Sequence, residues 1–361
     1  MKHAFTTIPG VFWIVTAVVL FFYRLNKKRY NEIVEELKME KEVDIVALGE
    51  LLIDFTEAGR GKDGMKLFEQ NPGGAPANLL TVASHMGYQT AFIGKIGTDM
   101  HGAFLKRTLQ NEGIAVEHLI EDDQYFTTLA FVEIDENGER KFSFARKPGA
   151  DTQLCKDELD ETLLAGCRIF HFGSLSLTDE PAKSATLEAI RIAKAAGALI
   201  SYDPNYRASL WKSEATAVEQ MKEVISFADV MKVSDEESLL LTGENTFEEA
   251  ADILLSMGPK LVAITLGSKG VLVATKEKKE HVDGFLTKAV DTTGAGDSFW
   301  GGFLSEFLSM HKTVENLDWE EVRACARKGN AVACLCVQKR GGIPSIPQKK
   351  EVEDFLKKQI G

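Results

Sequence analysis

The 361-residue sequence predicts an α/β domain in which a mainly parallel sheet lies between two layers of helices. From Val43 onward, short runs rich in β-branched residues alternate with amphipathic segments of helical length. Most of these short runs are apolar on both faces, as is typical of strands that are covered by helices on both sides. Several of the helical segments stop at a glycine, which is a common helix terminator. These three patterns favour consecutive βαβ units in one domain.

The expected elements follow one another in a nearly regular alternation. The strand candidates, each a short apolar run such as VDIVALG or KLVAITL, are 43–49, 90–96, 168–173, 198–203, 229–233 and 260–266. The helix candidates, each with apolar residues at helical spacing, are 77–86, 101–112, 181–196, 213–227 and 246–257. Four of these helices are followed directly by Gly87, Gly113, Gly197 or Gly258. A parallel strand pair needs a long crossover, and these helices have the length to supply it.

One segment departs from this alternation. Residues 127–134 and 139–146 alternate apolar and polar side chains around the sequence Asp-Glu-Asn-Gly at 135–138. The Asn-Gly step tolerates the positive φ angles of a tight hairpin turn. We expect a small antiparallel flap that covers a site or pairs with a second subunit, the alternative being a surface hairpin without such a role.

The first forty residues have a different character from the rest. Residues 4–23 are uncharged and mostly apolar, and Arg24, Lys27, Lys28 and Arg29 follow them. About twenty apolar residues can cross a bilayer as a helix, and the basic flank would then leave the rest of the chain in the cytoplasm. The reading that we favour is that a soluble domain begins at Met39 and that residues 1–38 are an extension. A cleaved signal fits less well, because no small-x-small cleavage site follows the apolar run.

Composition narrows the possible partners. Forty-two Lys and Arg against 54 Asp and Glu give a formal net charge of −12, which opposes binding to a nucleic acid. The five cysteines are odd in number and contain no C-x-x-C pair, which argues against a disulfide framework or a structural zinc site. A reducing, cytoplasmic environment fits these features best.

The strongest chemical signal is the segment Asp291-Thr292-Thr293-Gly294-Ala295-Gly296-Asp297, which precedes a long apolar helix. Three small residues at a helix start leave backbone N–H groups exposed to an anion, and the helix dipole favours negative charge there. A carboxylate directly after such a phosphate cradle needs a separate task, and accepting a proton from an attacking hydroxyl is one. A simple turn with a helix cap is the alternative reading of the glycine-rich loop.

Other catalytic and phosphate-binding patterns are absent from the sequence. It contains no G-x-x-x-x-G-K-[ST] loop and no protein-kinase motif set, and Gly294 and Gly296 lack the third glycine of a G-x-G-x-x-G dinucleotide fingerprint. None of the seven histidines belongs to an HExxH motif or lies near a serine elbow. His171, within an apolar strand candidate, is expected to be a hydrogen-bonded core residue.

The segment 291–297 resembles the DTTGAGD signature of the ribokinase-like (PfkB) family of carbohydrate kinases. The stretch Asn71-Pro72-Gly73-Gly74-Ala75-Pro76-Ala77-Asn78 looks like the same family's Gly-Gly signature, and the resemblance extends from about 43 to 355. It implies a ribokinase-like three-layer sandwich with a mainly parallel central sheet and a small β-stranded lid. The kinase domain would then cover 39–361, with lid parts near 56–72 and 127–146.

Within the family the sequence is most similar to fructokinases, through the segments GELLIDF at 49–55, FHFGSLSL at 170–177, DPNYR at 203–207 and KVSDEE at 232–237. This similarity implies ATP-dependent phosphorylation of D-fructose to fructose 6-phosphate. One departure is Ser234, where many relatives begin an N-x-x-E motif with Asn; fructokinases often share the serine. Kinases of 2-keto-3-deoxygluconate or of an aminoimidazole riboside carry both signatures and stay open as alternatives. An inactive kinase-like interaction protein is a further alternative, although it would not need to keep the loop and Asp297.

The resemblance also implies roles for single residues. Asp297 would be the catalytic base, assisted by the amides of Gly294, Ala295 and Gly296. The residues expected to bind the sugar, or in the case of the arginines the sugar or the transferring phosphate, are Asp54, Gly73, Gly74, Asn78, Arg146 and Arg207. The alternative for each of these six residues is a purely structural role in a turn, a helix cap or a surface ion pair.

Nucleotide and ions are assigned in the same way. Thr265, Gly267 and Asn330 match nucleotide-contact positions, and Glu237 would order water around Mg²⁺. A K⁺ site would use oxygen atoms of Asp291, Thr293, Cys336, Lys339, Gly341 and Ser345. The expected partners are a small sugar and ATP, with a homodimer through the lid possible and a membrane involved only if 4–23 is a true anchor.

Overall fold

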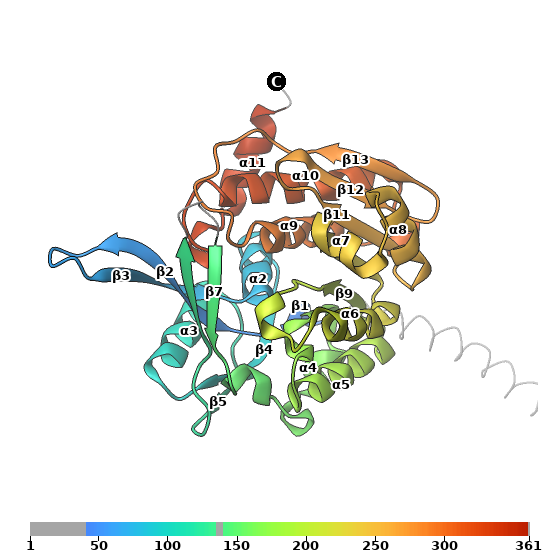
Figure 1. The fold of residues 1–361 in the computed structure, drawn as a ribbon. Coiled ribbons are helices and arrows are strands. Elements are labelled where there is room, and N and C mark those ends of the chain that lie inside the picture. The colour runs from blue at the N-terminus through green and yellow to red at the C-terminus, as the bar shows by residue number, and fades with distance from the viewer. Residues whose placement is uncertain (1–40, 135–139, 360–361) are drawn as a thin grey trace, which may run out of the picture. The chain divides into compact units, whose positions relative to one another are not determined.

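The computed structural model describes residues 41–134 and 140–359, and its main body begins at Val43. Within these residues a nine-stranded sheet forms the centre (Figure 1). In spatial order its strands are β13 (Lys279–Asp283), β12 (Gly270–Ala274), β11 (Leu261–Thr265), β10 (Val230–Ser234), β9 (Leu199–Asp203), β8 (Cys167–Gly173), β1 (Val43–Leu48), β4 (Thr90–Gly97) and β5 (Leu119–Asp122). All neighbours from β11 to β5 pair in parallel, and β11–β12–β13 form an antiparallel end.

Helices cover both faces of this sheet. One face carries α2 (Ala75–His85), α3 (Met100–Asn111), α9 (Ala295–Ser309) and α10 (Trp319–Cys336). The other face carries α4 (Glu161–Ala165), α5 (Ala182–Ala195), α6 (Glu214–Glu223), α7 (Asp235–Thr242) and α8 (Phe247–Ser256). Helix α11 (Lys349–Lys358) packs on α2 and α10 through a smaller cluster. The predicted three-layer α/β architecture is confirmed.

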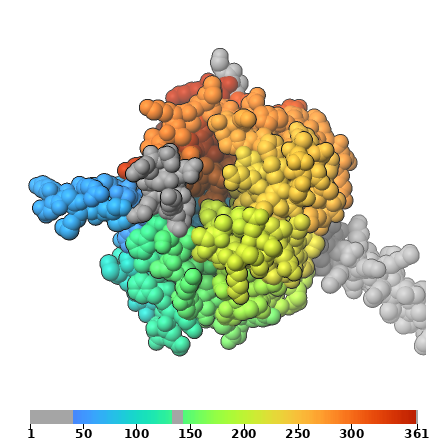
Figure 2. Space-filling model, in the orientation of Figure 1, coloured from blue at the N-terminus to red at the C-terminus, as the bar shows by residue number. Residues whose placement is uncertain are grey.

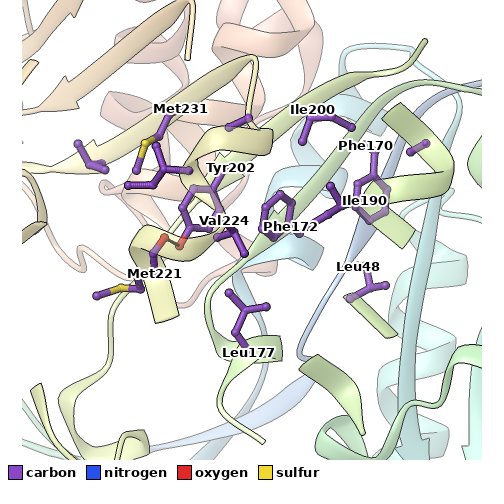
Figure 3. Packing of buried hydrophobic residues seen from close by; sticks show 14 of the residues in the cluster. Leu48, Phe170, Phe172, Leu177, Ile190, Ile200, Tyr202, Met221, Val224 and Met231 are labelled. Carbon is purple, nitrogen blue, oxygen red and sulfur yellow. Dashed lines mark hydrogen bonds between the residues drawn. The ribbon is translucent and has the colours of Figure 1, made fainter. Parts of the chain in front are cut away.

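The strands that are apolar on both faces contribute side chains to two separate hydrophobic cores. In β1, Val46 and Leu48 enter the core under α5, whereas Ile45 and Ala47 enter the core under α9. This division follows from the two-residue period of a strand. In the first core the rings of Phe172 and Tyr202 stack with centroids 4.8 Å apart, which ties β8 to β9 (Figure 3). Burial of these aromatic rings holds the strand ends that carry the site in fixed register.

A second, four-stranded sheet forms the lid beside the main body. Its spatial order is β3 (Lys66–Gly73), β2 (Leu52–Arg60), β6 (Leu129–Ile134) and β7 (Arg140–Ala145). The β6–β7 hairpin is antiparallel as predicted, while its turn at 135–139 lies outside the described residues. The expectation of a purely antiparallel flap is wrong, because β2 pairs with β6 in parallel where the two hairpins meet. In Figure 1 the ends of β2 and β3 project from the body.

The expected helix boundaries differ from the observed ones by more than one residue at two places. The segment 213–227 is not one helix, since α6 ends at Glu223 and a 3₁₀ turn at Ile225–Phe227 follows, which places Ile225 in the core. Helix α2 begins at Ala75 rather than 77, because Pro76 is compatible with the first turn of a helix. The four terminating glycines all have positive φ, between 74° and 149°.

The N-terminal prediction falls outside what can be compared. Residues 1–38, including the apolar run at 4–23, are not among the described residues, so the choice between anchor and extension stays a prediction. Across 41–134 and 140–359, no helix combines the length and the apolar character that a membrane crossing requires.

Candidate active site

A cleft of about 560 Å³ opens at the carboxyl ends of the parallel strands, between the main sheet, the lid and helices α2, α7 and α9. Figure 2 shows the surface hollowed between the segments coloured orange and those coloured green. This is the edge of an open parallel sheet at which ligands generally bind. The segments 71–78, 205–207, 232–237 and 292–297 all contribute to its lining.

The phosphate cradle predicted from the sequence has the expected form. Gly294 adopts φ 74°, a left-handed conformation that favours glycine, and α9 begins at the next residue. The first amides of an α-helix have no partner four residues earlier within the helix and are suited to hold an anion. The Ala295 amide here donates to the Thr292 carbonyl oxygen at 3.2 Å. Asp297 lies in this first turn and lines the cleft. The loop and the carboxylate therefore occupy the same corner of the site.

The two signature segments meet at this corner. Asn78 lies in the first turn of α2, and its Nδ2 donates a hydrogen bond to Asp297 Oδ2 at 2.8 Å. Its Oδ1 is buried and accepts no hydrogen bond from the described residues. Close packing of the two helices fixes this arrangement: a Cβ on Gly301 would lie 2.7 Å from Val82 Cβ and 2.9 Å from the Leu79 carbonyl oxygen. An amide oxygen is thereby left for a ligand that donates a hydrogen bond.

The Gly-Gly turn brings the lid strand β3 to the same place. Gly74 has φ 123°, and a Cβ there would approach the Glu50 carbonyl oxygen to 2.4 Å. A Cβ on Gly73 would lie 2.2 Å from Asp54 Oδ2, so only glycine fits beside this carboxylate. Asp54, Gly74 and Asn78 all line the cleft. The structure thus brings together these three of the predicted sugar-binding residues, with Gly73 packed directly against Asp54.

Charges around Asp297 are densely packed. Burial raises the pKa of the Asp297 carboxyl, and the Lys232 charge and the Asn78 hydrogen bond counteract this rise. Lys232 is 5% exposed, and its Nζ lies 2.9 Å from Asp203 Oδ2 at the end of β9. Burial opposes the charge of Lys232, but the carboxylates of Asp203, Glu237 and Asp297 raise its pKa. The ammonium ion therefore stays protonated at neutral pH.

Two further carboxyl groups are perturbed. Burial raises the pKa of Asp203 to about 7, with Lys232 opposing and Glu237 and Asp297 adding to the rise. Burial likewise raises the pKa of Glu50 to about 7, although its Oε1 accepts a hydrogen bond from the Ala75 amide at 2.9 Å. Such shifts are common where charged groups are concentrated in a functional cleft.

Glu237 and Arg207 are placed on the opposite side of the cleft from α2. Glu237 belongs to the first turn of α7, where its carboxylate accepts from the backbone amides of Ser234 at 2.8 Å and Tyr206 at 2.6 Å. Ser234 caps the same helix by accepting from the Glu237 amide at 3.1 Å. Arg207 is exposed at the rim, where its charge lowers the pKa of Asp297. Both residues line the cleft, and their roles stay predictions.

A neighbouring pocket of about 280 Å³ continues from the cradle. Thr265 and Gly267 line both cavities, and Asn330 lines the second one. Asn330 Nδ2 donates to the carbonyl oxygens of Val282 at 3.2 Å and Asp283 at 3.0 Å, and so ties α10 to β13. The remaining lining is largely apolar, which suits a flat aromatic ring. It includes Phe285, Leu286, Ala289, Phe299, Ala333 and Val337.

The segments of the expected cation loop also lie side by side. Asp291 accepts hydrogen bonds from the Thr293 amide at 2.9 Å, the Thr293 hydroxyl at 2.8 Å and the Gly341 amide at 3.0 Å. Cys336 Sγ lies 2.9 Å from Ser345 Oγ, which donates to the Gly342 carbonyl oxygen at 2.7 Å. Backbone oxygens of this region are hard ligands that suit a monovalent cation. Lys339 occupies the same turn, after the end of α10.

Arg146, like Gly73, is a predicted sugar-binding residue that does not line the cleft. Its guanidinium donates to Asp151 Oδ2 at 2.7 Å, Thr178 Oγ1 at 2.9 Å and the Leu175 carbonyl oxygen at 2.9 Å. The side chain is buried and faces a separate cavity of about 680 Å³. Its contact with a sugar or a phosphate stays a prediction, since in this structure it joins the lid strand β7 to the main body.

Sequence reasoning gave no role to Lys232, Asp203 or Glu50. Lys232 is a charged residue in the apolar strand Val-Met-Lys-Val-Ser, and Asp203 ends another apolar strand. A charge in a strand that is buried on both faces was the available signal, because such a charge needs a buried partner.

Among the described residues no group of three His, Cys, Asp or Glu side chains has metal-binding geometry. All five cysteines lie in described segments, and none of them forms a disulfide bond.

Comparison with known proteins places this geometry in context. The model of the pfkB family of carbohydrate kinases matches residues 43–349. Probable fructokinase-4 of Arabidopsis thaliana is 42% identical over 316 residues, which are 87% of this chain and 96% of the relative. The matched segment therefore spans nearly the whole relative and most of this chain.

Solved structures of fructokinases superpose on this chain. Fructokinase from Xylella fastidiosa with bound ATP superposes with a TM-score of 0.82 at 31% identity, covering 88% of this chain and 99% of that one. Fructokinase from Vibrio cholerae O395 with fructose, ADP and calcium ion has a TM-score of 0.79 at 32% identity, covering 87% and 99%. A double mutant of the same enzyme contains fructose, ADP and potassium ion, with a TM-score of 0.78 at 31% identity, covering 87% and 98%.

Proposed function

The chain belongs to the pfkB family of carbohydrate kinases, and we propose that it transfers the γ-phosphoryl group of ATP to the 6-hydroxyl of D-fructose. As an ATP-dependent sugar kinase it must hold a sugar hydroxyl and a phosphoryl group in line at one point. The observation that carries the proposal is the contact between Asn78 and Asp297, because it joins the sugar-binding turn to the phosphate cradle. The choice of the 6-hydroxyl follows from the similarity to fructokinases.

Asp297 acts as the general base in this proposal. Its carboxylate takes the proton from the sugar hydroxyl while the hydroxyl oxygen attacks the phosphorus atom and ADP leaves. Burial raises the pKa of Asp297, which makes it a stronger base than an exposed aspartate. The amides of Gly294, Ala295 and Gly296 stabilise the negative charge that develops on the transferring group. The Asp297 carboxylate and the cradle amides both belong to the start of α9, which keeps them in fixed relative positions.

The charge of the cleft supports a requirement for cations together with ATP. Among the described lining residues six are acidic, namely Glu50, Asp54, Asp235, Glu236, Glu237 and Asp297, and only Arg207 and Lys232 are basic. A polyphosphate would be repelled by this surface unless it arrived with a cation. We propose Mg²⁺, which neutralises the β and γ oxygens of ATP when bound. Glu237 would order its water ligands, since carboxylates in such sites usually contact Mg²⁺ through water.

A monovalent cation is proposed beside the cradle. The loops that contain Asp291, Thr293 and Gly341 are already joined by hydrogen bonds, and the oxygen-rich turn suits K⁺. The remaining proposed ligands are the carbonyl oxygens of Cys336 and Lys339 and the Ser345 hydroxyl. The potassium ion in the Vibrio cholerae relative supports the same choice. The bound ion would fix the backbone that presents the cradle amides.

The sugar is proposed to bind between the lid and α2. Asp54 and the Asn78 Oδ1 atom would accept hydrogen bonds from its hydroxyl groups, and Gly73 and Gly74 would allow close approach. Arg207 would balance charge at the rim, and Arg146 would contribute if lid closure moves β7. Thr265, Gly267 and Asn330 would surround the nucleotide. Such closure excludes water and limits ATP hydrolysis.

We also propose how the protein assembles and where it is located. The lid exposes Met65, Leu67, Phe68 and Phe131, the first to 69% and the last to 38%, and a second copy could cover this apolar surface in a homodimer. A cytoplasmic location fits five cysteines that form no disulfide bond, and the net charge of −12 argues against a nucleic-acid partner.

A panel of acceptors tests the proposal. The protein is assayed with Mg-ATP and fructose, glucose, ribose, 2-keto-3-deoxygluconate or aminoimidazole riboside, and kcat/KM is compared. We expect fructose to give the highest value. A higher kcat/KM for another sugar would contradict the proposed substrate, and no turnover of any acceptor would contradict the kinase assignment.

A further inference from the structure

Lys232 occupies an unusual place beneath the phosphate cradle. It points from β10 toward the first turn of α9, and a Cβ added to Gly296 would lie 2.8 Å from Lys232 Nζ and 3.4 Å from Lys232 Cε. The ammonium group is thus packed against the cradle itself, in space that a glycine leaves open. Asp203 holds it there through a contact of 2.9 Å between Nζ and Oδ2. Two carboxyl-terminal strand ends therefore fix one positive charge under the loop.

The charges that face Asp297 come from every neighbouring element. Lys232 on β10 and Arg207 after β9 lower the pKa of Asp297, and Glu237 on α7 raises it. Asp297 in turn raises the pKa of Asp203 on β9, and α2 contributes the neutral hydrogen bond from Asn78. Arg207 is exposed to solvent, which weakens its effect. Lys232 is the buried cation among these groups, so its charge acts in a medium of low polarity.

Building on the proposed function, we propose that Lys232 is a positioning residue of the transfer reaction. Held by Asp203 against Gly296, its ammonium group keeps the Asp297 side chain in the carboxylate form that can accept the sugar proton. Lys232 itself neither gains nor loses a proton in the step. The sugar proton goes to Asp297, the new bond joins the sugar oxygen to phosphorus, and the broken bond releases ADP.

Two features distinguish this role from simple packing. Lys232 lines the cleft, and two of the three carboxylates that raise its pKa, Glu237 and Asp297, line the cleft as well. The protein contains a lysine of the simpler kind for comparison. Lys95 is 4% exposed and bridges Asp122 at 3.2 Å and Glu158 at 2.7 Å, and it does not line the cleft.

The test compares Lys232→Met with Lys95→Met in the full-length protein. Both substitutions remove a buried ammonium group and keep a similar side-chain length. The measured quantities are kcat/KM for fructose at saturating Mg-ATP between pH 5 and 9.5, and the melting temperature. For Lys232→Met we expect kcat/KM at low pH, where it is proportional to the ionised fraction of Asp297, to fall about tenfold for each unit by which the pKa of Asp297 rises. In the plot of kcat/KM against pH, the acidic limb is the low-pH side on which activity falls. We also expect this limb to move up by about one pH unit or more, so that activity partly returns at high pH.

Lys95→Met should lower the melting temperature and leave the acidic limb in place. An unshifted limb in Lys232→Met, with the same loss at every pH or with no loss, would overturn the proposal. If Lys232→Met does not fold, Lys232→Arg keeps the positive charge and Lys232→Gln removes it with a polar side chain. The limb should stay in place in Lys232→Arg and move up in Lys232→Gln, and equal limbs in the two variants would overturn the proposal. Absence of fructose turnover in the unsubstituted protein would instead contradict the proposed function.

Discussion

Asn78 Nδ2 and Asp297 Oδ2 lie 2.8 Å apart although the two residues are separated by 219 positions in the sequence. Each residue lies in the first turn of its helix, α2 or α9, and the two helices pack directly on each other. The hydrogen bond therefore joins the end of the lid strand β3 to the phosphate cradle. This contact orients the base and leaves the Asn78 Oδ1 atom for the sugar.

Replacing the base gives the first prediction. Asp297→Asn keeps the shape and the contact with α2 but cannot accept a proton. We expect kcat to fall by about two to four orders of magnitude, with little change in the affinity for Mg-ATP. Steady-state kinetics and a nucleotide-binding titration measure these two quantities. Turnover close to that of the unsubstituted protein would remove Asp297 from the mechanism.

The second prediction concerns Asn78. In Asn78→Ala both the hydrogen bond to Asp297 and the proposed acceptor for a sugar hydroxyl are lost. At about 1 kcal/mol for each hydrogen bond, KM for fructose should rise about tenfold or more and kcat should also fall. KM for ATP should change little, because the adjoining nucleotide pocket does not include α2. An increase confined to KM for ATP would show that this residue serves the nucleotide instead.

Potassium dependence gives the third prediction. If Asp291, Thr293 and Ser345 help to form the cation site, K⁺ should raise activity above that in Na⁺ or Li⁺ at equal ionic strength. The variant Asp291→Ala should lose this difference, because Asp291 also joins Thr293 to Gly341. Initial rates in the three chloride salts provide the measurement. Equal rates for the unsubstituted protein in all three salts would argue against the cation.

The fourth prediction concerns His171, which lies in the core behind the site. Ser201 Oγ lies 2.9 Å from His171 Nδ1 and accepts a hydrogen bond from Trp300 Nε1 at 2.8 Å, which confirms the predicted hydrogen-bonded core histidine. Burial, followed by the Lys232 charge, lowers the pKa of His171 to about 3. Below pH 6.5 the unfolded chain binds a proton that the folded protein does not bind. The stability contributed by neutral His171 is therefore complete above pH 6.5 and is lost as the pH falls toward 3.

Chemical denaturation of the unsubstituted protein and of His171→Phe, at several pH values from 7 to 4.5, tests this effect. The difference in unfolding free energy should change by about 1.4 kcal/mol per pH unit below 6.5, to the disadvantage of the unsubstituted protein. Effects of other titrating groups cancel in the difference. Two parallel stability curves would show that His171 is protonated in the folded state.

The sequence predicted the parts of the fold that depend on local pattern. The strand and helix periodicities placed the central sheet, and the two glycine-rich signatures placed Asn78 and Asp297 at helix starts. The β2–β3 hairpin was expected only through the family resemblance, as a lid part near 56–72, because its outer residues are exposed and show no clear alternation of apolar and polar side chains. Its parallel pairing with β6 depends on contact between hairpins that are distant in the sequence.

Single charged residues were harder to interpret. Arg146 was expected to reach the substrate, but Asp151, five residues later, holds its guanidinium, and no local pattern indicates that partner. Lys232 gained a role only when β9 and β10 placed it between Asp203 and Gly296. Both cases depend on the partner of a buried charge, and tertiary structure determines which side chain becomes that partner.

The most direct test of the account identifies the product. The protein is incubated with Mg-ATP and D-fructose in potassium buffer, and the phosphorylated product is assigned by phosphorus and proton NMR while ADP is measured in parallel. We predict fructose 6-phosphate in a one-to-one ratio with ADP, and almost none of either with Asp297→Asn. Release of ADP without a sugar phosphate, or formation of fructose 1-phosphate, would contradict the account.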